Sequence, residues 1–390
     1  MASPKKIIPQ ESMKDIATKL VHSGFHGDEY GSVMPAIYTT RTHTLDFQST
    51  YVYSRWGNPT RSAFEEAMAE IENGKYAIAT ACGLAAVATV FHIIPSGSHI
   101  IAGDDLYGGT TTYLKDIVPE YQKLEVSQFD VGKPEEVKKL FKENTKLVYI
   151  ETPTNPTLKV LDIAFFAKLC KSKNCILVVD NTFLSPYFQN PIDLGADIVL
   201  HSGTKYIGGH SDLLIGVIVT KDEALYNRML KVQRLLGTMS NPFDCYLAFR
   251  GLKTLKLRME ACQENAIKIA ELLKSHPKVE KVLYCGFPDH PGYKIMKKQA
   301  RGFGAIISFY HKSDLEATKR FCSELKLFCN AVSLGAVESL AHAPVIVTHK
   351  SVPADMKKKL GITDNLIRLS VGIEGIEDLK ADILKALDKI

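Results

Sequence analysis

Lys205 lies in the segment DIVLHSGTKYIGGH (197–210), where an apolar, strand-like run ends in small hydroxyl residues and a glycine pair. A lysine at the end of a buried strand is partly removed from water, which lowers its pKa and makes its amine a usable nucleophile. From its position alone, a solvated loop lysine is the commoner alternative. Ser202 and Thr204 add hydroxyl donors, and the glycine pair lets backbone amides approach an anion. The segment lacks the spacing of a P-loop, so it indicates a carbonyl ligand that also carries a phosphate.

An acid and a helix start extend this candidate site. Asp180 ends the apolar run CILVVD, where a buried carboxylate needs a positive partner; a cap for the following turn is the alternative. Gly83 and Leu84 open an alanine-rich helix in ATACGLAAVATV. Their free amides and the helix dipole favour phosphate, although a glycine before a helix is common in α/β proteins.

An aromatic residue and two arginines complete the set. Tyr107 in DDLYGGTTTY follows a strand-like run, so its ring can cover a planar ligand and its phenol can exchange a proton; core packing is the alternative. Arg55 in YVYSRWGNPTR and Arg368 in NLIRLSVG are the arginines best placed to bind oxyanions. A Schiff-base lysine, an acid, an aromatic cover, a phosphate cup and an arginine together are what pyridoxal 5'-phosphate (PLP) requires.

The elements that must position these residues are short β-branched runs alternating with helical patterns. The alternation predicts a parallel-rich sheet with crossover helices, an α/β fold. Ligands of such sheets lie beyond the carboxyl ends of the strands, where Asp180 and Lys205 stand. Helices at 313–324 and 376–389, between further strand-like runs, predict a smaller α+β domain. The expected strands of the large sheet are 99–104, 123–129, 146–151, 175–180, 197–202 and 214–220.

Composition narrows the class of protein. The chain has 390 residues, 45% hydrophobic and 23% charged residues and a net charge of +5, typical of a globular protein and without the basic stripe of a nucleic-acid binder. Residues 76–103 carry no charge, but glycines and a proline interrupt them, and we read strand, turn, buried helix and strand rather than a membrane span. Eight scattered cysteines and a start without an apolar signal core favour a reducing, cytoplasmic location. We expect no metal site.

The chain resembles the transsulfuration family of PLP-dependent enzymes, which includes cystathionine lyases and synthases and methionine γ-lyase, and most closely the γ-lyases of cystathionine. The resemblance covers nearly the whole chain. It implies the fold-type I PLP-dependent transferase-like architecture: a mostly parallel seven-stranded sheet in a PLP-binding domain (61–257), a smaller α+β C-terminal domain (258–390), and an N-terminal arm (1–60) that contacts a neighbouring subunit. Its markers, in the family's order, are YSRWGNPTR, LYGGT, ETPTNPT, VVDNTF, HSGTKYIGGHSD, RGLKTL, SLGAVESLAHAP and LIRLSVGIE.

The resemblance also implies a role for individual residues. Lys205 forms the Schiff base with the cofactor and then acts as base, Asp180 pairs with the ring nitrogen, and Tyr107 stacks on the ring while assisting proton transfer. The remaining cofactor contacts implied are Gly83, Leu84, Ser202 and Thr204 at the phosphate, Thr182 near the ring, and Tyr53 and Arg55 from the neighbouring subunit. The implied substrate contacts are Asn155, Ser339, Arg368 and Glu338.

The implied reaction is the α,γ-elimination of L-cystathionine to L-cysteine, 2-oxobutyrate and ammonia, with hydrogen sulfide-producing side reactions, in a homotetramer of dimers that share active sites. Cystathionine γ-synthase activity on an acylated homoserine is the first alternative and methionine γ-lyase the second. Gly109 stands where methionine γ-lyases usually have a cysteine, and Glu338 matches γ-lyases and γ-synthases. Cys82, Gly203 and the pair Thr111–Thr112 depart from the family pattern.

Overall fold

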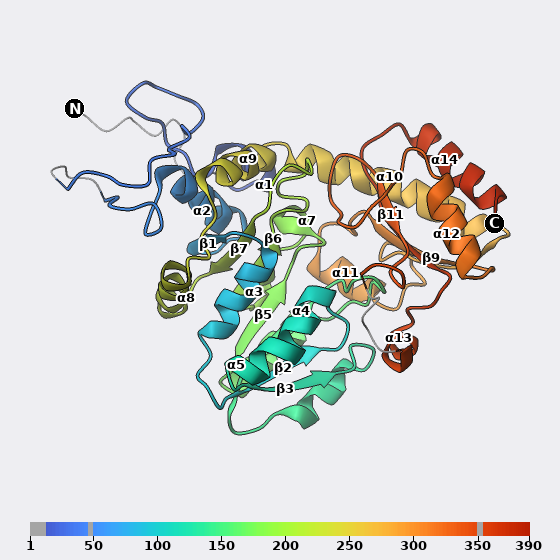
Figure 1. The fold of residues 1–390 in the computed structure, drawn as a ribbon, viewed down its shortest axis with the longest axis horizontal. Helices are drawn as coiled ribbons and strands as arrows, with labels where there is room; N and C mark the ends of the chain where they lie inside the picture. The colour runs from blue at the N-terminus through green and yellow to red at the C-terminus, as the bar shows by residue number, and fades with distance from the viewer. Residues whose placement is uncertain (1–12, 46–49, 349–353) are drawn as a thin grey trace.

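A seven-stranded mixed sheet forms the larger half of the molecule (Figure 1). The computed structural model describes residues 13–45, 50–348 and 354–390. The strand order is β1-β7-β6-β5-β4-β2-β3; β7 runs antiparallel to both of its neighbours, and the other pairs are parallel. The strands are β1 (Tyr76–Thr80), β2 (His99–Gly103), β3 (Glu125–Phe129), β4 (Thr145–Glu151), β5 (Ile176–Asp180), β6 (Ile198–Ser202) and β7 (Gly216–Thr220).

These strands confirm the predicted mostly parallel α/β sheet, and residues 76–103 form a strand, a helix and a strand as expected. Both faces of the sheet are covered, which explains why its strands read as continuous apolar runs. One face carries α3 (Gly83–His92) and α8 (Glu223–Leu236). The other is covered by α2 (Pro59–Ile71), α6 (Ile163–Ser172) and α9 (Pro242–Leu252). In Figure 1, α3, α4 and α5 lie in front of the sheet. None of the described helices is long and apolar enough to cross a membrane.

The helices around this sheet mostly begin where the sequence supplies a cap. Asp162 and Asp222 accept backbone N–H groups at the starts of α6 and α8, and Asn58 precedes Pro59 at the start of α2. These helices and short turns are α1 (Ile16–His22), α2 (Pro59–Ile71), α3 (Gly83–His92), α4 (Gly108–Thr112), a π-helical turn (Tyr113–Ile117), α5 (Val118–Tyr121), a 3₁₀ turn (Pro134–Leu140), α6 (Ile163–Ser172), α7 (Ser185–Phe188), a second 3₁₀ turn (Pro191–Leu194) and α8 (Glu223–Leu236).

The C-terminal part contains the second sheet, with strand order β10-β11-β12-β9-β8. Helices α10, α12 and α14 pack against it around a separate apolar core. This confirms the smaller α+β unit, with α12 and α14 at the predicted helical segments. The predicted domain boundary at residue 258 falls within α10, and the domain limits stay a prediction. The elements are α9 (Pro242–Leu252), α10 (Leu255–Ser275), β8 (Val279–Leu283), α11 (Tyr293–Gln299), β9 (Ile306–His311), α12 (Leu315–Glu324), β10 (Cys329–Asn330), β11 (Leu340–His342), α13 (Ala354–Leu360), β12 (Leu366–Ser370) and α14 (Ile376–Asp388).

Between α1 and α2, the described part of the N-terminal segment extends away from the body of the molecule (Figure 1). Between α1 and α2 its described residues have little regular structure, apart from a bridge between Thr42 and Tyr53. Several large apolar side chains in it are exposed, including Tyr30 at 84% and Val33 at 79%. The arm at 1–60 and its contact with a neighbouring subunit stay a prediction.

Candidate active site

A cavity of about 380 Å³ opens at the carboxyl ends of β4, β5 and β6. This is the edge at which parallel strands place their ligands. Nine predicted site residues line it: Gly83, Leu84, Tyr107, Asn155, Asp180, Thr182, Ser202, Thr204 and Lys205. Their positions in the sequence span more than a hundred residues, so only the folded sheet brings them together.

Lys205 lies in the turn that follows β6, and the turn is tightly fixed. The backbone N–H groups of Gly208 and Gly209 donate to the carbonyls of Gly203 and Lys205, both at 2.8 Å. Arg258 of α10, itself buried, donates to the carbonyl of Tyr206 at 2.6 Å. The lysine side chain consequently projects from a rigid backbone into the cavity.

Lys205 is held in an environment that disfavours its charge. Its Nζ donates to Ser333 Oγ at 2.7 Å, and no carboxylate is among its described hydrogen-bond or ion-pair partners. Burial, and then the positive charge of Arg368, lowers the pKa of Lys205 to about 8. A fraction of its amine is therefore neutral near physiological pH, as a nucleophile or base requires.

The predicted phosphate cup consists of the start of α3 and the end of β6. Cys82 precedes α3 and makes no side-chain hydrogen bond to its first turn, so the thiol leaves the first amides of the ten-residue helix available to an anion. A Cβ on Gly83 would lie 2.9 Å from Ser202 Cβ, so glycine is what allows the helix to approach β6. Thr204 Oγ1 bonds to the backbone of Ile215, which fixes the hydroxyl at the cavity wall.

Gly203, which the family pattern does not require, has a packing reason. A Cβ at this position would lie 2.6 Å from Ile215 Cγ2 and 3.5 Å from Val217 Cγ2. Without a side chain, the Lys205 turn lies directly on β7 and the segment leading into it.

Asp180 stands at the end of β5 and is oriented by two donors. The Thr182 N–H donates to Oδ1 at 2.9 Å, and the buried Tyr149 hydroxyl donates to Oδ2 at 3.2 Å. Burial raises the pKa of Asp180 above its ordinary value, while the Thr182 bonds, the charge of His201 and the Tyr149 bond act in the opposite direction. A carboxylate at this half-buried position is complementary to a cationic ring nitrogen.

Tyr107 has an anchored backbone and an open ring. Its N–H donates to both carboxyl oxygens of Glu151, at 3.0 Å each, while its side chain is 51% exposed. Glu151 ends β4 beside Asp180 in the sheet register. Burial, followed by the charge of Asp180, raises the pKa of Glu151 well above its ordinary value.

Arg368 reaches the site from the second sheet. It lies on β12, is 2% exposed, and donates from NH1 to Asn155 Oδ1 at 2.9 Å and from NH2 to the Ser333 carbonyl. Its Nε is buried without a partner among the described residues. Burial lowers the pKa of Arg368 to about 10. An arginine with a free donor beside Lys205 is suited to bind an amino-acid carboxylate.

Ser339 and Glu338, the other two predicted substrate contacts, do not line the cavity of Lys205. The Ser339 hydroxyl donates to Glu374 and accepts from the Gly372 N–H, and Ser339 is fully buried outside the cavity lining. Glu338 accepts from Ser211 and lines a second cavity of about 770 Å³. That cavity shares Thr204, Leu214 and Leu334 with the first, so the two are contiguous.

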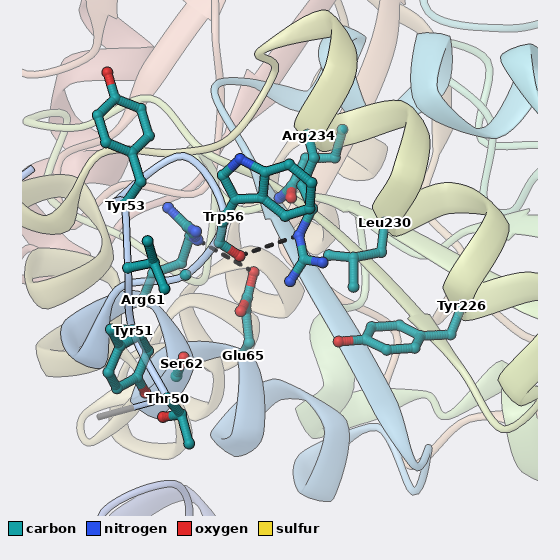
Figure 2. Close-up of a pocket in the computed structure, with 13 residues that line it drawn as sticks. Thr50, Tyr51, Tyr53, Trp56, Arg61, Ser62, Glu65, Tyr226, Leu230 and Arg234 are labelled. Atoms are coloured by element: carbon teal, nitrogen blue, oxygen red, sulfur yellow. Dashed lines mark hydrogen bonds and ion pairs between the residues drawn. The ribbon is translucent and has the colours of Figure 1, made fainter. Parts of the chain in front are cut away.

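Tyr53 and Arg55 do not meet Lys205 within one chain. Arg55 NH1 donates to the carbonyl of Arg234 at 2.7 Å, and its guanidinium lies 5.7 Å from the Tyr53 ring centre. Tyr53 lines a separate cavity of about 610 Å³ between the arm, α2 and α8, which Figure 2 shows with Trp56, Glu65 and Arg234. The role expected of Tyr53 and Arg55 requires a second subunit and stays a prediction.

The expectation that the protein has no metal site also stays a prediction. The ligand atoms of His26, Glu66 and Glu70 lie within 4.8 Å of one another near the start of the arm. His26 Nε2 is hydrogen-bonded to Glu66 Oε1 at 2.8 Å, and this bond accounts for the closest contact.

Sequence reasoning missed Ser333 and Tyr149 at this site. Ser333 contacts both Lys205 and Arg368 and has a φ of 92°, a left-handed conformation that is unusual for serine. It lies in a loop, where no periodicity marks it. Tyr149 lies inside a buried strand, and its position two residues before the strand end was a usable signal.

The chemistry of the groups around the cavity fits a PLP molecule. They are an amine with a lowered pKa, a half-buried acid, an open aromatic ring and a helix start with free amides.

A family model described as Cys/Met metabolism PLP-dependent enzyme matches residues 17–388. A cystathionine gamma-lyase of Dictyostelium discoideum is 49% identical over 96% of this chain and 98% of its own length. A cystathionine beta-lyase of Lactococcus lactis subsp. cremoris is 45% identical over 97% of this chain and all of its own length. The crystal structure of cystathionine gamma-lyase from Lactobacillus plantarum complexed with L-serine has a TM-score of 0.93 and 42% identity, covering 96% of this chain and 99% of that one.

Proposed function

Because this chain belongs to the PLP-dependent enzymes of cysteine and methionine metabolism, we propose that it is a carbon–sulfur lyase that converts L-cystathionine by α,γ-elimination into L-cysteine, 2-oxobutyrate and ammonia. The choice of substrate rests on the two contiguous cavities. The first is lined by Lys205, with Arg368 close to that lysine, and the second is lined by acids. L-Cystathionine has an amino-acid group at each end, so it needs two such regions.

Bound PLP supplies the electron sink that stabilises negative charge at the substrate's α-carbon. Lys205 would hold its aldehyde, Asp180 its ring nitrogen, and the start of α3 its phosphate. The two bonds from Thr182 and Tyr149 support this assignment, because they hold the carboxylate of a residue that lines the cavity.

Lys205 would serve as the base that removes the proton from the substrate's α-carbon, and its Nζ carries that proton for the next step. A pKa near 8 keeps both protonation states accessible at neutral pH. Tyr107, whose backbone Glu151 fixes, would cover the ring and move a proton through its phenol oxygen.

Arg368 and Asn155 would bind the α-carboxylate of the substrate. Their mutual hydrogen bond at 2.9 Å leaves Nε of the arginine without a partner among the described residues. The far end of the substrate carries an ammonium group beside a second carboxylate, and the second cavity is lined by three acids, Asp212, Asp244 and Glu338. Their negative charges are complementary to that ammonium.

Product analysis with L-cystathionine tests this function. We expect 2-oxobutyrate and cysteine. Pyruvate and homocysteine as main products would instead assign the β-elimination of the Lactococcus lactis relative. A faster reaction with acylated homoserine plus cysteine would assign a γ-synthase, and release of sulfide from cysteine would measure the proposed side reaction.

We also propose a homotetramer built from dimers with shared active sites. The arm supports this, because it exposes large apolar side chains and holds Tyr53 and Arg55 away from the lysine of its own chain. Lys205→Ala and Arg55→Ala should each be inactive. A refolded equal mixture should recover about one quarter of wild-type activity, because half of the dimers are hybrids and each hybrid has one intact site. No recovery in a mixture shown to contain hybrids would exclude sharing.

We place the protein in the cytoplasm, because its eight cysteines are free and seven of them lie at buried or half-buried positions. Fractionation of cells that express the tagged chain tests this location; recovery in a secreted fraction would contradict it.

A further inference from the structure

The end of α6 brings Cys170 and Cys175 together. The helix ends in a Schellman turn: the Cys175 N–H donates to the Cys170 carbonyl at 3.1 Å, and the Asn174 N–H donates to the Lys171 carbonyl at 3.3 Å. Asn174 has a φ of 50°, the left-handed conformation this turn requires. The two positions that usually make an apolar contact across such a turn are here both cysteines.

The two thiols stand at these facing positions of the turn and differ in character. Their interaction lowers the pKa of Cys175 and raises the pKa of Cys170. The carboxylate of Asp197, which accepts from the Leu177 N–H at 2.7 Å, faces the pair and acts against ionisation of both thiols. Cys175 is also the more exposed of the two, so it is the nucleophile of the pair, and Cys170 is the second thiol across the same turn.

Cys175 is buried but lies nearer the surface than Cys170. It is 8% exposed and follows four consecutive exposed residues, 171–174, whereas Cys170 is 1% exposed. Two of the four are lysines, which favour an anionic reagent. The pair precedes β5, at the opposite end of that strand from Asp180, so it is separate from the PLP cavity.

We propose that Cys170 and Cys175 form a redox modification site that reacts with low-molecular-weight disulfides and closes to an intramolecular disulfide. The Cys175 thiolate attacks one sulfur of the reagent, releasing one thiol and leaving a mixed disulfide. Cys170 then loses its proton to solvent and attacks the Cys175 sulfur, releasing the second thiol. Two protein thiols are oxidised, and one disulfide is reduced to two thiols.

Glutathione disulfide tests the site on the purified holoenzyme. After incubation at mildly alkaline pH, acid quenching and alkylation, trypsin cleaves after Lys171 and Lys173, between the two cysteines. We expect a disulfide that joins peptide 169–171 to the peptide beginning at Asn174, and its loss on reduction. The exposed Cys329 should carry glutathione under the same conditions and reports that the reagent is active.

Two single variants assign the order of reaction. Cys170→Ser should stop at glutathione on Cys175, because the second thiol is missing. Cys175→Ser should leave Cys170 unmodified at the time when the wild type is fully linked. Free Cys170 and Cys175 in a sample whose Cys329 is modified, or faster labelling of Cys170 than of Cys175, would overturn the proposal.

Discussion

Replacing Lys205 by methionine in the cofactor-free protein should stabilise the fold at neutral pH. Burial and the charge of Arg368 lower the pKa of Lys205 from 10.5 to about 8. The unfolded chain keeps the ordinary value, and each unit corresponds to 1.36 kcal/mol, so holding the charge in the fold costs about 3 kcal/mol. Methionine fills similar space without charge. The loss of the bond to Ser333 offsets part of the gain, and we expect a net stabilisation of about 2 kcal/mol.

This advantage must shrink as the pH rises. Below pH 8, Lys205 is charged in both the folded and unfolded states, and the full cost is present. Above pH 8 the folded protein loses the proton while the unfolded chain keeps it, so the wild type gains stability up to about pH 10.5. By about pH 9.5 less than half of the electrostatic cost remains.

Urea unfolding of both cofactor-free proteins, followed by circular dichroism between pH 6.5 and about 9.5, measures the difference. Lys231→Met on the exposed side of α8 is the matched control and should leave the unfolding midpoint unchanged at every pH. A Lys205→Met protein no more stable than wild type at pH 7 would refute the desolvation argument. So would an advantage that does not change with pH.

Two further substitutions test residues that the sequence did not reveal. Tyr149→Phe removes the hydroxyl that donates to Asp180 at 3.2 Å, and we expect about tenfold weaker cofactor binding in a fluorescence titration. Tyr113→Phe, which also keeps a ring packed beside Phe91, should bind the cofactor as the wild type does; equal binding by both variants would contradict the role of the Asp180 bond. Ser333→Ala removes the acceptor for Lys205 Nζ, and kcat should fall about tenfold with little change in KM. An unchanged kcat would show that Ser333 does not orient the lysine.

The sequence predicted those site residues that stand at the end of a strand or at the start of a helix, because both positions leave a local pattern in the sequence. Asp180 and Lys205 each follow an apolar run, and Gly83 opens an apolar helix, so a parallel sheet was enough to place them at one edge. The antiparallel β7 was not foreseen, because its apolar run reads like those of its neighbours. Pairing direction depends on how the chain returns to the sheet, which no local pattern records.

Site residues that lie in loops could not be predicted from these local patterns. Ser333 reaches Lys205 across 128 positions of sequence, from a loop in which its own φ is left-handed. Ser339, six residues further along in the same family-like segment, turns instead to Glu374 and Gly372. The motif located the segment, and Ser333 is the serine of that segment that contacts the lysine; the substrate role of Ser339 stays a prediction.

Asp180 and Glu151 show how the fold assigns different tasks to two acids at one sheet edge. They are register partners, and burial raises the pKa of both. Asp180 receives donors from Thr182 and Tyr149, which favour its charged form, so it is prepared to meet a positive ring nitrogen. Glu151 receives only the backbone N–H of Tyr107 among the described hydrogen bonds, and the charge of Asp180 disfavours its ionisation. Ionising Asp180 for the cofactor thus disfavours ionisation of its neighbour Glu151, which fixes the backbone of the tyrosine proposed to cover the ring.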